Sequence, residues 1–424
     1  MTTLFYEDFV VGELHSEESL NFSYLGEWAD RRSTFPLSMT MPTNTISYGP
    51  EKILPWLANL LPESHLSEIG QKLKVSPQDI VGVLEHLGRD TAGAISVGAP
   101  RKSGSTTVIP ITDEAALEKI INELPEKPFL IGTEGVSMSL AGVQDKLPVY
   151  MLVSGSLGVP TDGTPSTHIL KPNALKTRLP ASVQNEAFCM RLAKHCGLDV
   201  ANVTTGVAGS RSYLLVERYD RIRDGKGFVR RIHQEDFCQV LGYFPAQKYE
   251  RSRFGGRNGP TLADMFKAIE EFISPGEREK LLDAVIFNVL ICNTDAHAKN
   301  YSILIGQRGT AKLAPLYDLM CSAIYSNVDQ SLAQSIAGKT NANELHAADW
   351  KELAASVNLS PAKTLRRVQS LAESVLKNAE MVANEISVSS VGGHDLLNQV
   401  SHEVQKRGKR ILRQLDAENA VWSK

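Results

Sequence analysis

The strongest constraint on the fold is a change of pattern along the chain, from short strands to helices. After residue 132, β-branched and aliphatic residues form short runs separated by Gly, Ser and Pro, which is typical of strands. These runs are residues 147–153, 167–171, 203–205 and 212–216. One helix is expected among them, ending at Gly197, and beyond His233 the pattern is mainly helical apart from a hairpin near residues 301–313. We therefore predict a bilobal α+β fold, with a strand-rich first lobe, a helical second lobe and chemistry between them.

A smaller α+β module precedes the two lobes. Its early segments alternate strand-like and turn-like residues, and apolar residues at helical spacing predict a helix over 53–61. A second helix is expected to open at Ser76-Pro77, because serine caps helices and proline suits the first helical position. A Gly- and Ser-containing linker at 98–107 ends the module. The predicted domains are 1–110, 130–222 and 223–424.

Charge and cysteine content narrow the function classes. The chain carries 45 Lys and Arg against 48 Asp and Glu, so no global field draws it to nucleic acid. Its five cysteines are scattered without a Cys-x-x-Cys pair, which supports neither a disulfide framework nor a zinc site. The longest apolar run is far shorter than the roughly 18 residues of a membrane span, and the N-terminus lacks the pattern of a secretory signal. We expect a cytoplasmic protein without a membrane partner.

The most informative segment is the loop from Cys292 to Ser302, between an apolar helix and a strand. Asp295 and Asn300 have the D-x-x-x-x-N spacing of the protein-kinase catalytic loop. That spacing lets one tight loop direct a carboxylate at an acceptor hydroxyl and an amide oxygen at a metal ion. The match is common by chance, and both residues could instead be turn residues that cap a strand.

Three further residues occur in the order of kinase site residues. Asp318 follows the hairpin and can return to Asn300 to complete an oxygen site for magnesium, although the local sequence is Tyr-Asp-Leu and not Asp-Phe-Gly. Lys171 ends a strand of the first lobe, and Glu186 lies on the following helix, in the order of the kinase lysine–glutamate pair. Lys171 or Glu186 alone could be a surface charge. The lysine–glutamate pair, Asp295, Asn300 and Asp318 fill four roles in the kinase order, which favours a phosphoryl-transfer site.

Two segments of the first lobe are candidates for binding a nucleotide. The loop 139–146, here called the cradle loop, precedes the first strand, and main-chain N–H groups on such a loop can hold phosphate oxygens. The segment 216–221, here called the hinge, leaves the last strand, and its main chain at 217–219 could pair with adenine while Tyr219 packs on the ring. Tyr219 could equally be an ordinary core residue. The candidate nucleotide-binding residues of these segments are Ser139, Ala141, Gly142, Val143, Gln144, Glu217, Arg218 and Tyr219.

In combination these motifs resemble HipA-type serine/threonine kinases, the toxins of type II toxin–antitoxin pairs. The resemblance covers essentially the whole chain. It rests on residues 139–146, 167–171, 185–186, 216–221, 234–236, 295–300 and 317–318. It implies a fold distantly similar to protein kinases and phosphoinositide kinases, with ATP and Mg²⁺ as cofactors.

The resemblance also implies a role for each site residue. Asp295 would be the catalytic aspartate, Asn300 and Asp318 the magnesium ligands, Lys171 the contact to the ATP phosphates, and Ser139 an autophosphorylation site that inactivates the kinase. Glu217 and Tyr219 would flank adenine. The remaining residues expected at the nucleotide site are Glu186, Arg218, His297 and Lys299. For His297 a structural hydrogen bond is the favoured role, since no second histidine has metal-ligand spacing.

The expected partners also come from the resemblance. They are a HipB-like helix-turn-helix antitoxin, operator DNA bound mainly through that antitoxin, and a protein substrate of the aminoacyl-tRNA synthetase class, with glutamyl-tRNA synthetase as the family example. Two basic segments have no assigned role: the loop 248–257, a candidate activation-like loop, and the helix 406–413. The alternatives are a small-molecule or lipid kinase, or a corepressor without catalysis.

Overall fold

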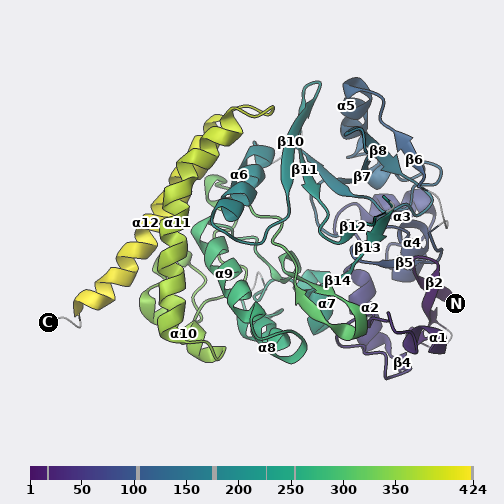
Figure 1. The fold of residues 1–424 in the computed structure, drawn as a ribbon, viewed down its shortest axis with the longest axis horizontal. Helices are drawn as coiled ribbons and strands as arrows, with labels where there is room; N and C mark the ends of the chain where they lie inside the picture. Colours follow the sequence, from purple (N-terminus) through teal and green to yellow (C-terminus); the bar gives the residue numbers. More distant parts are fainter. Residues whose placement is uncertain (17–18, 102–105, 174–178, 226, 253–254, 422–424) are drawn as a thin grey trace. The chain divides into compact units, whose positions relative to one another are not determined.

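The computed structural model describes the chain except residues 17–18, 102–105, 174–178, 226, 253–254 and 422–424 and the side chains of 417–421 (Figure 1). Contacts divide it into two compact units that interleave in sequence. Unit 1 contains residues 1–172, 207–246 and 302–312, and unit 2 contains 173–206, 247–301 and 313–424. Strands dominate unit 1 and helices dominate unit 2, so the expected α+β class is confirmed. The three predicted domain segments stay a prediction.

Unit 1 begins with an antiparallel five-stranded sheet in the order β4-β3-β2-β1-β5. Alternate side chains of its strands are buried, among them Leu4, Leu14 and Phe22, because successive residues of a strand face opposite sides of the sheet. The elements here are β1 Thr2–Tyr6, β2 Phe9–His15, β3 Asn21–Tyr24, α1 Gly26–Ala29, β4 Ser47–Tyr48, α2 Pro50–Ala58, α3 Leu66–Leu73, α4 Ile80–Leu87 and β5 Ile95–Val97.

The expected start of one helix in this module is wrong. Helix α4 begins at Ile80 and not at Ser76-Pro77, because the carboxylate of Asp79 accepts a hydrogen bond from the Gly82 N–H at 2.9 Å and caps the helix there. The Ser76 hydroxyl instead bonds the Gln78 side chain at 2.8 Å within the preceding turn.

The second sheet, whose strands other than β10 lie in unit 1, has six strands in the order β10-β11-β9-β7-β8-β6. Its apolar core includes Leu147, Val149 and Leu170 from the central strands and Ile121 from helix α5. All four strands expected from the sequence in this region are present. The elements are β6 Val108–Pro110, α5 Glu114–Glu123, η1 Pro128–Leu130, β7 Leu147–Met151, β8 Leu157–Pro160, β9 His168–Pro172, β10 Val203–Ala208 and β11 Arg211–Glu217.

A third sheet, in the order β14-β15-β16, contains the expected hairpin. Asp236 ends β14 and caps helix α7 reciprocally with Gln239, which explains why a carboxylate stands at this strand–helix junction. The remaining elements of unit 1 are β12 Arg221–Arg223, β13 Val229–Arg231, β14 His233–Asp236, α7 Phe237–Leu241, η2 Pro245–Gln247, β15 Ser302–Ile305, η4 Gln307–Gly309 and β16 Ala311–Leu313.

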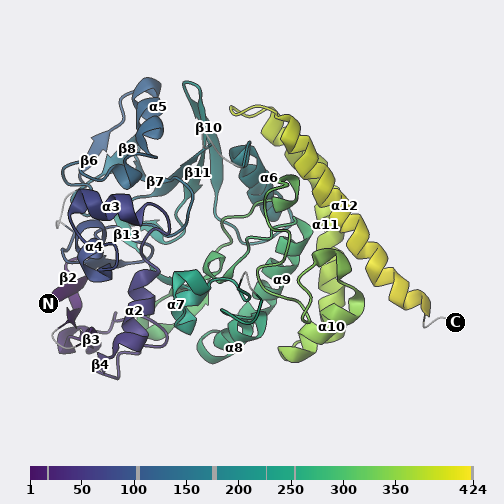
Figure 2. The same ribbon diagram turned by 180° about the vertical axis from the view of Figure 1, so that it is seen from behind.

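Unit 2 is a helical body in which the two long helices α11 and α12 lie side by side (Figures 1 and 2). In α11 the buried residues Val368, Leu371, Val375 and Val382 recur every three to four positions or at multiples of that spacing, as expected for one buried face. Helix α6 ends as predicted, with Gly197 in the left-handed region at φ +79°. The elements are α6 Ser182–His195, α8 Leu262–Phe272, α9 Glu277–Leu290, η3 Ala298–Asn300, η5 Ser322–Ile324, η6 Ala342–Glu344, α10 Ala347–Ser356, α11 Pro361–Ser387 and α12 Asp395–Val421. Within the described part of the chain, no helix has the length and apolar character that crossing a membrane requires.

Candidate active site

The loop that follows helix α9 in unit 2 presents Asp295 to the surface. The loop turns sharply at Cys292, whose φ of +57° lies in the left-handed region. Asn293 then holds the next turn, because its amide nitrogen donates to the Asn288 side chain at 2.9 Å and its amide oxygen accepts from the Asp295 N–H at 3.1 Å. Thr294 donates to the main-chain oxygen of Asp329 at 2.7 Å. Asp295 is exposed while its neighbours on both sides are buried, so the fold displays this one carboxylate.

The same loop brings Asn300 back to Asp295. The Asn300 amide nitrogen donates to the main-chain oxygen of Asp295 at 2.8 Å, which fixes the side chain and directs its amide oxygen elsewhere. The Tyr317 hydroxyl donates to the main-chain oxygen of Lys299 at 2.5 Å, so the segment carrying Asp318 lies against this loop. An amide oxygen and a carboxylate are the hard oxygen ligands that Mg²⁺ prefers. The residues present therefore fit a magnesium site.

Tyr249 is a neighbour of Asp295 that the sequence did not single out. Its hydroxyl donates to the Asp295 carboxylate, and its ring meets the His297 ring edge to face, with centroids 5.2 Å apart. His297 is buried, and its N–H donates to the Asp295 main-chain oxygen at 2.7 Å. The only sequence signal was an aromatic residue within the basic loop 248–257, of which residues 253–254 lie outside the described part.

The cradle loop in unit 1 is tied to the N-terminal module. The Ser139 hydroxyl has no exposed surface and donates to the Leu60 main-chain oxygen at 2.6 Å. The main-chain oxygen of Gly142 accepts from the Glu63 N–H at 3.2 Å, and that of Val143 from the Ser64 hydroxyl at 3.1 Å. Because residues of the N-terminal module bond these carbonyl oxygens, the main-chain N–H groups of the cradle loop are suited to bind an anion.

The backbone conformation at Gly142 favours glycine. Its φ is +107°, and a Cβ there would lie 2.4 Å from the Nζ of Lys146. Lys146 in turn donates to the main-chain oxygen of Ala141 at 2.6 Å and closes the loop upon itself. The cradle loop is thus a preformed turn.

Lys171 and the hinge belong to two neighbouring strands of the six-stranded sheet. Lys171 on β9 lies opposite Leu214 on β11 and is largely buried. The hinge begins at the end of β11, where Glu217 is exposed and Tyr219 is half-buried. The N–H of Arg218 donates to the main-chain oxygen of Thr167 at 2.9 Å, which ties the hinge to the start of β9.

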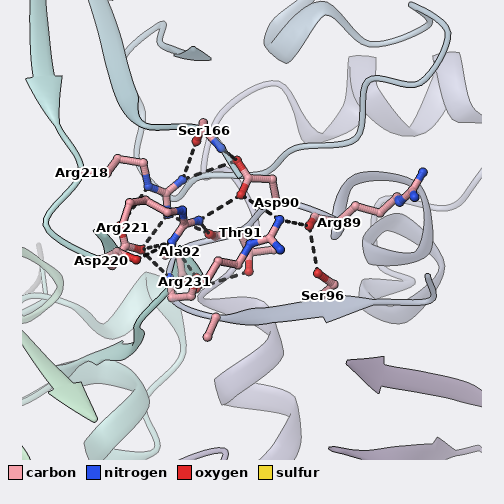
Figure 3. A network of polar contacts seen from close by, with 12 residues as sticks. Arg89, Asp90, Thr91, Ala92, Ser96, Ser166, Arg218, Asp220, Arg221 and Arg231 are labelled. Atoms are coloured by element: carbon pink, nitrogen blue, oxygen red, sulfur yellow. Dashed lines mark hydrogen bonds and ion pairs between the residues drawn. The ribbon is translucent and has the colours of Figure 1, made fainter. Parts of the chain in front are cut away.

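The Arg218 side chain lies in a buried group of five charges, here called the charge cluster (Figure 3). Its guanidinium donates to both Asp220 oxygens at 2.9 and 2.7 Å and to the Ser166 hydroxyl at 2.9 Å. Any contribution of Arg218 to nucleotide binding therefore comes from its main chain. The cluster consists of Asp90, Arg218, Asp220, Arg221 and Arg231, all nearly inaccessible to solvent.

Asp90 of the N-terminal module is the centre of this cluster. Its carboxylate pairs with Arg221 at 3.0 Å and with Arg231 at 3.3 Å, and its main-chain oxygen accepts from the Ser139 N–H at 3.0 Å. Burial alone would raise the pKa of the Asp90 carboxyl, but Arg221, Arg218 and Arg231 outweigh it and hold the pKa well below its ordinary value. Burial and the like charge of Arg218 lower the pKa of Arg221 to about 10, so it stays charged at neutral pH.

The structure thus brings the expected site residues together in two sets. Unit 1 holds the cradle loop, Lys171 and the hinge, and unit 2 holds Glu186 and the loop with Asp295, Asn300 and Asp318. The predicted pairing of Lys171 with Glu186, and the assignment of both sets to one site, stay predictions. The described residues include no cluster of three or more His, Cys, Asp or Glu side chains arranged to hold a metal ion, and the magnesium set proposed from the sequence uses one carboxylate and one amide.

Comparison with known protein families finds two matches. Residues 2–98 match the HipA N-terminal domain, and residues 138–381 match the HipA-like C-terminal domain. The second match alone covers more than half of the chain and contains the cradle loop, Lys171, the hinge, Asp295, Asn300 and Asp318.

Curated relatives and a solved structure agree with these matches. A putative kinase, Y4mE, of Sinorhizobium fredii is 38% identical over 393 residues, covering 90% of each chain. The serine/threonine-protein kinase toxin HipA of Shewanella oneidensis is 33% identical over 356 residues, covering 80% of this chain and 79% of the relative. The structure of Shewanella oneidensis HipA with HipB and operator DNA has a TM-score of 0.81 at 27% identity, over 98% of this chain and 99% of that one. The expected kinase-like fold is therefore confirmed.

Proposed function

The chain belongs to the HipA family, and on that premise we propose that it is an ATP- and magnesium-dependent serine/threonine-protein kinase that acts as the toxin of a toxin–antitoxin pair. The observation that carries the proposal is the display of Asp295. It is an exposed carboxylate on a loop whose main chain is held by Asn293 and Asn300, in the spacing of a kinase catalytic loop.

In this mechanism Asp295 orients the acceptor hydroxyl and accepts its proton as the phosphoryl group is transferred in line. Asn300 and Asp318 would hold magnesium, which when bound supplies positive charge that neutralises the phosphates. The Asn300 side chain suits that role, because its nitrogen is engaged with the Asp295 main chain and its oxygen is directed elsewhere. His297 and Lys299, both buried, support the loop between these residues.

Apart from Glu186, the residues proposed to hold the nucleotide belong to unit 1. The N–H groups of the cradle loop at 141–144 and the Lys171 ammonium face the negative charge of the phosphates, and Glu186 orients Lys171. The main chain at Glu217 to Tyr219 pairs with adenine. Preorganisation supports this assignment, because contacts to Leu60, Glu63 and Ser64 hold the cradle loop.

Ser139 is proposed as the self-phosphorylation site. Its hydroxyl has no exposed surface, so it must leave its bond to Leu60 before it can accept phosphate. A phosphoserine carries close to two negative charges and cannot return to a loop that cradles the ATP phosphates. Phosphorylation at Ser139 would therefore inactivate the kinase.

The proposed partners follow from the relatives. The Shewanella oneidensis protein was solved with HipB and operator DNA, and we extend to this chain a HipB-like antitoxin and DNA contact through it. The proposed protein substrate is an aminoacyl-tRNA synthetase, on the family resemblance alone.

The proposal is tested by the rate of phosphate transfer from ATP to the chain with magnesium, here called turnover, comparing the wild type with Asp295→Asn and Asp318→Ala in chain prepared free of phosphate. We expect Asp295→Asn to lose turnover by at least about a thousandfold while it still binds ATP, since the nucleotide contacts lie elsewhere. We expect Asp318→Ala to lose the magnesium dependence of ATP binding. Full turnover by Asp295→Asn would refute the assignment of the catalytic aspartate, and an unchanged magnesium titration would refute that of Asp318.

A further inference from the structure

We propose that Tyr249 is a positioning residue for the catalytic carboxylate, an inference that rests on the proposed role of Asp295. The Tyr249 hydroxyl donates to Oδ1 of Asp295. A donor on one carboxylate oxygen restricts rotation of the group and so fixes the direction from which it can meet the incoming hydroxyl. In this arrangement Tyr249 does not touch the reacting atoms. It sets the orientation of the group that does.

The residues on both sides of Tyr249 are anchored, so its direction is built into the fold. The main-chain oxygen of Lys248 accepts from the Ala298 N–H at 3.1 Å and from the Gln334 amide at 3.2 Å. On the other side, the Glu250 N–H donates to the main-chain oxygen of Ala333 at 3.0 Å.

Glu250 is held by its side chain as well. Its carboxylate accepts from the Ser335 N–H at 2.6 Å and from the Ser335 hydroxyl at 2.8 Å. Tyr249 therefore stands between two fixed points, one of which, Ala298, belongs to the same loop as Asp295.

The Tyr249 ring gives the contact a second support. It packs edge to face on His297, at 5.2 Å between centroids and 85° between planes, and the Lys248 ammonium lies 5.5 Å from the ring centre. His297 is itself bonded to the Asp295 main chain at 2.7 Å. The tyrosine thus holds both the carboxylate and the residue two positions later.

Tyr249 could in principle be a pseudosubstrate, that is, a residue of the chain that occupies the place of the acceptor hydroxyl. Its fixed position argues against that role. A pseudosubstrate must leave the carboxylate before the true acceptor can enter, whereas the anchors at Lys248 and Glu250 hold Tyr249 in place.

The test is Tyr249→Phe in the full chain, which keeps the ring packing and removes only the hydroxyl. The readout is the rate of self-phosphorylation with ATP and magnesium in chain prepared free of phosphate, separated into its maximal rate constant (kcat below) and the ATP concentration that gives half of it (KM below). We expect kcat to fall about 10- to 100-fold, the rate equivalent of one hydrogen bond to a charged group, with the KM for ATP within about twofold of the wild type. That split is what positioning of the carboxylate predicts, because ATP binding does not involve Asp295.

Tyr317→Phe is the matched control. It removes another tyrosine hydroxyl that bonds the same loop, but at the main-chain oxygen of Lys299 and not at the carboxylate. A much smaller loss of kcat in Tyr317→Phe supports the proposal, and equal losses would reduce Tyr249 to general support of the loop. A rise in kcat in Tyr249→Phe would overturn the proposal in favour of a pseudosubstrate. If Asp295→Asn is inactive and Tyr249→Phe matches the wild type, this inference fails alone; if Asp295→Asn is active, the proposed function fails first.

Discussion

At the scale of single residues, the fold places two carboxylates in opposite environments, one exposed and one buried. Asp295 is exposed and held by a tyrosine hydroxyl, as an acceptor of a proton must be. Glu235 on β14 is fully buried and accepts the Met39 N–H at 2.8 Å, so it joins β14 to the N-terminal module. Burial raises the pKa of Glu235 to about 8, despite the hydrogen bonds from Met39 and Ser38, which lower it.

The raised pKa of Glu235 predicts a pH dependence of stability. The folded chain holds this proton up to about pH 8, whereas the unfolded chain releases it near the ordinary value of 4.5. The stability that comes from the protonated form is thus complete below pH 4.5 and is lost as pH rises through 8. Between pH 4.5 and 8, the stability of Glu235→Gln measured by urea unfolding should therefore fall by roughly 3–6 kcal/mol less than that of the wild type. Parallel profiles for the two proteins would contradict the account.

At the scale of elements, the N-terminal module holds the segments proposed to bind the nucleotide. Leu60, Glu63 and Ser64 bond the cradle loop, and Asp90 bonds both that loop and the arginines of the hinge. A module that sequence analysis separates from the lobes is thus part of the framework of the nucleotide site within unit 1.

The cradle loop predicts a contrast between two glycines. Gly142 and Gly155 both have positive φ, so alanine at either should cost about 1–2 kcal/mol of stability. A Cβ at Gly142 would also displace the Lys146 ammonium from its hydrogen bond to the Ala141 main-chain oxygen, whereas one at Gly155, in the β7–β8 turn, has no atom within 4 Å. We expect Gly142→Ala alone to weaken ATP binding, by about tenfold in a calorimetric titration. Equal ATP affinity in the two variants would argue against the cradle loop as a phosphate site.

The charge cluster predicts a large loss of stability from one isosteric change. Asp90→Asn leaves Arg218, Arg221 and Arg231 buried with a single remaining carboxylate in the cluster, which should cost about 3–5 kcal/mol in denaturant unfolding. Asp224→Asn is the matched control, because its partner Arg230 is largely exposed, so loss of this ion pair should cost at most about 1 kcal/mol. A similar small loss in both variants would show that the cluster is not structurally important.

At the scale of the whole molecule, the sequence predicted the fold class, the main strands and the spacing of Asp295 and Asn300, because periodicity and loop chemistry are local. It missed the cap at Asp79, because serine and aspartate can both cap a helix and the sequence pattern pointed to the serine three residues earlier. It also missed the partnerships of Asp90 with the hinge and of Tyr249 with Asp295, since these join residues 46 to 131 positions apart and leave no local pattern. Arg218 illustrates the difference: its place in the hinge was predicted, and the direction of its side chain was not.

The most direct test of the account is to map phosphate on the chain by mass spectrometry after incubation with ATP and magnesium. The account predicts one phosphate on Ser139 in the wild type, none in Asp295→Asn, and none at that position in Ser139→Ala. Chain prepared free of phosphate is the starting material, so that the modification is made in the reaction. A wild type that binds ATP but gains no phosphate on any residue would contradict the claim that this chain phosphorylates itself at Ser139.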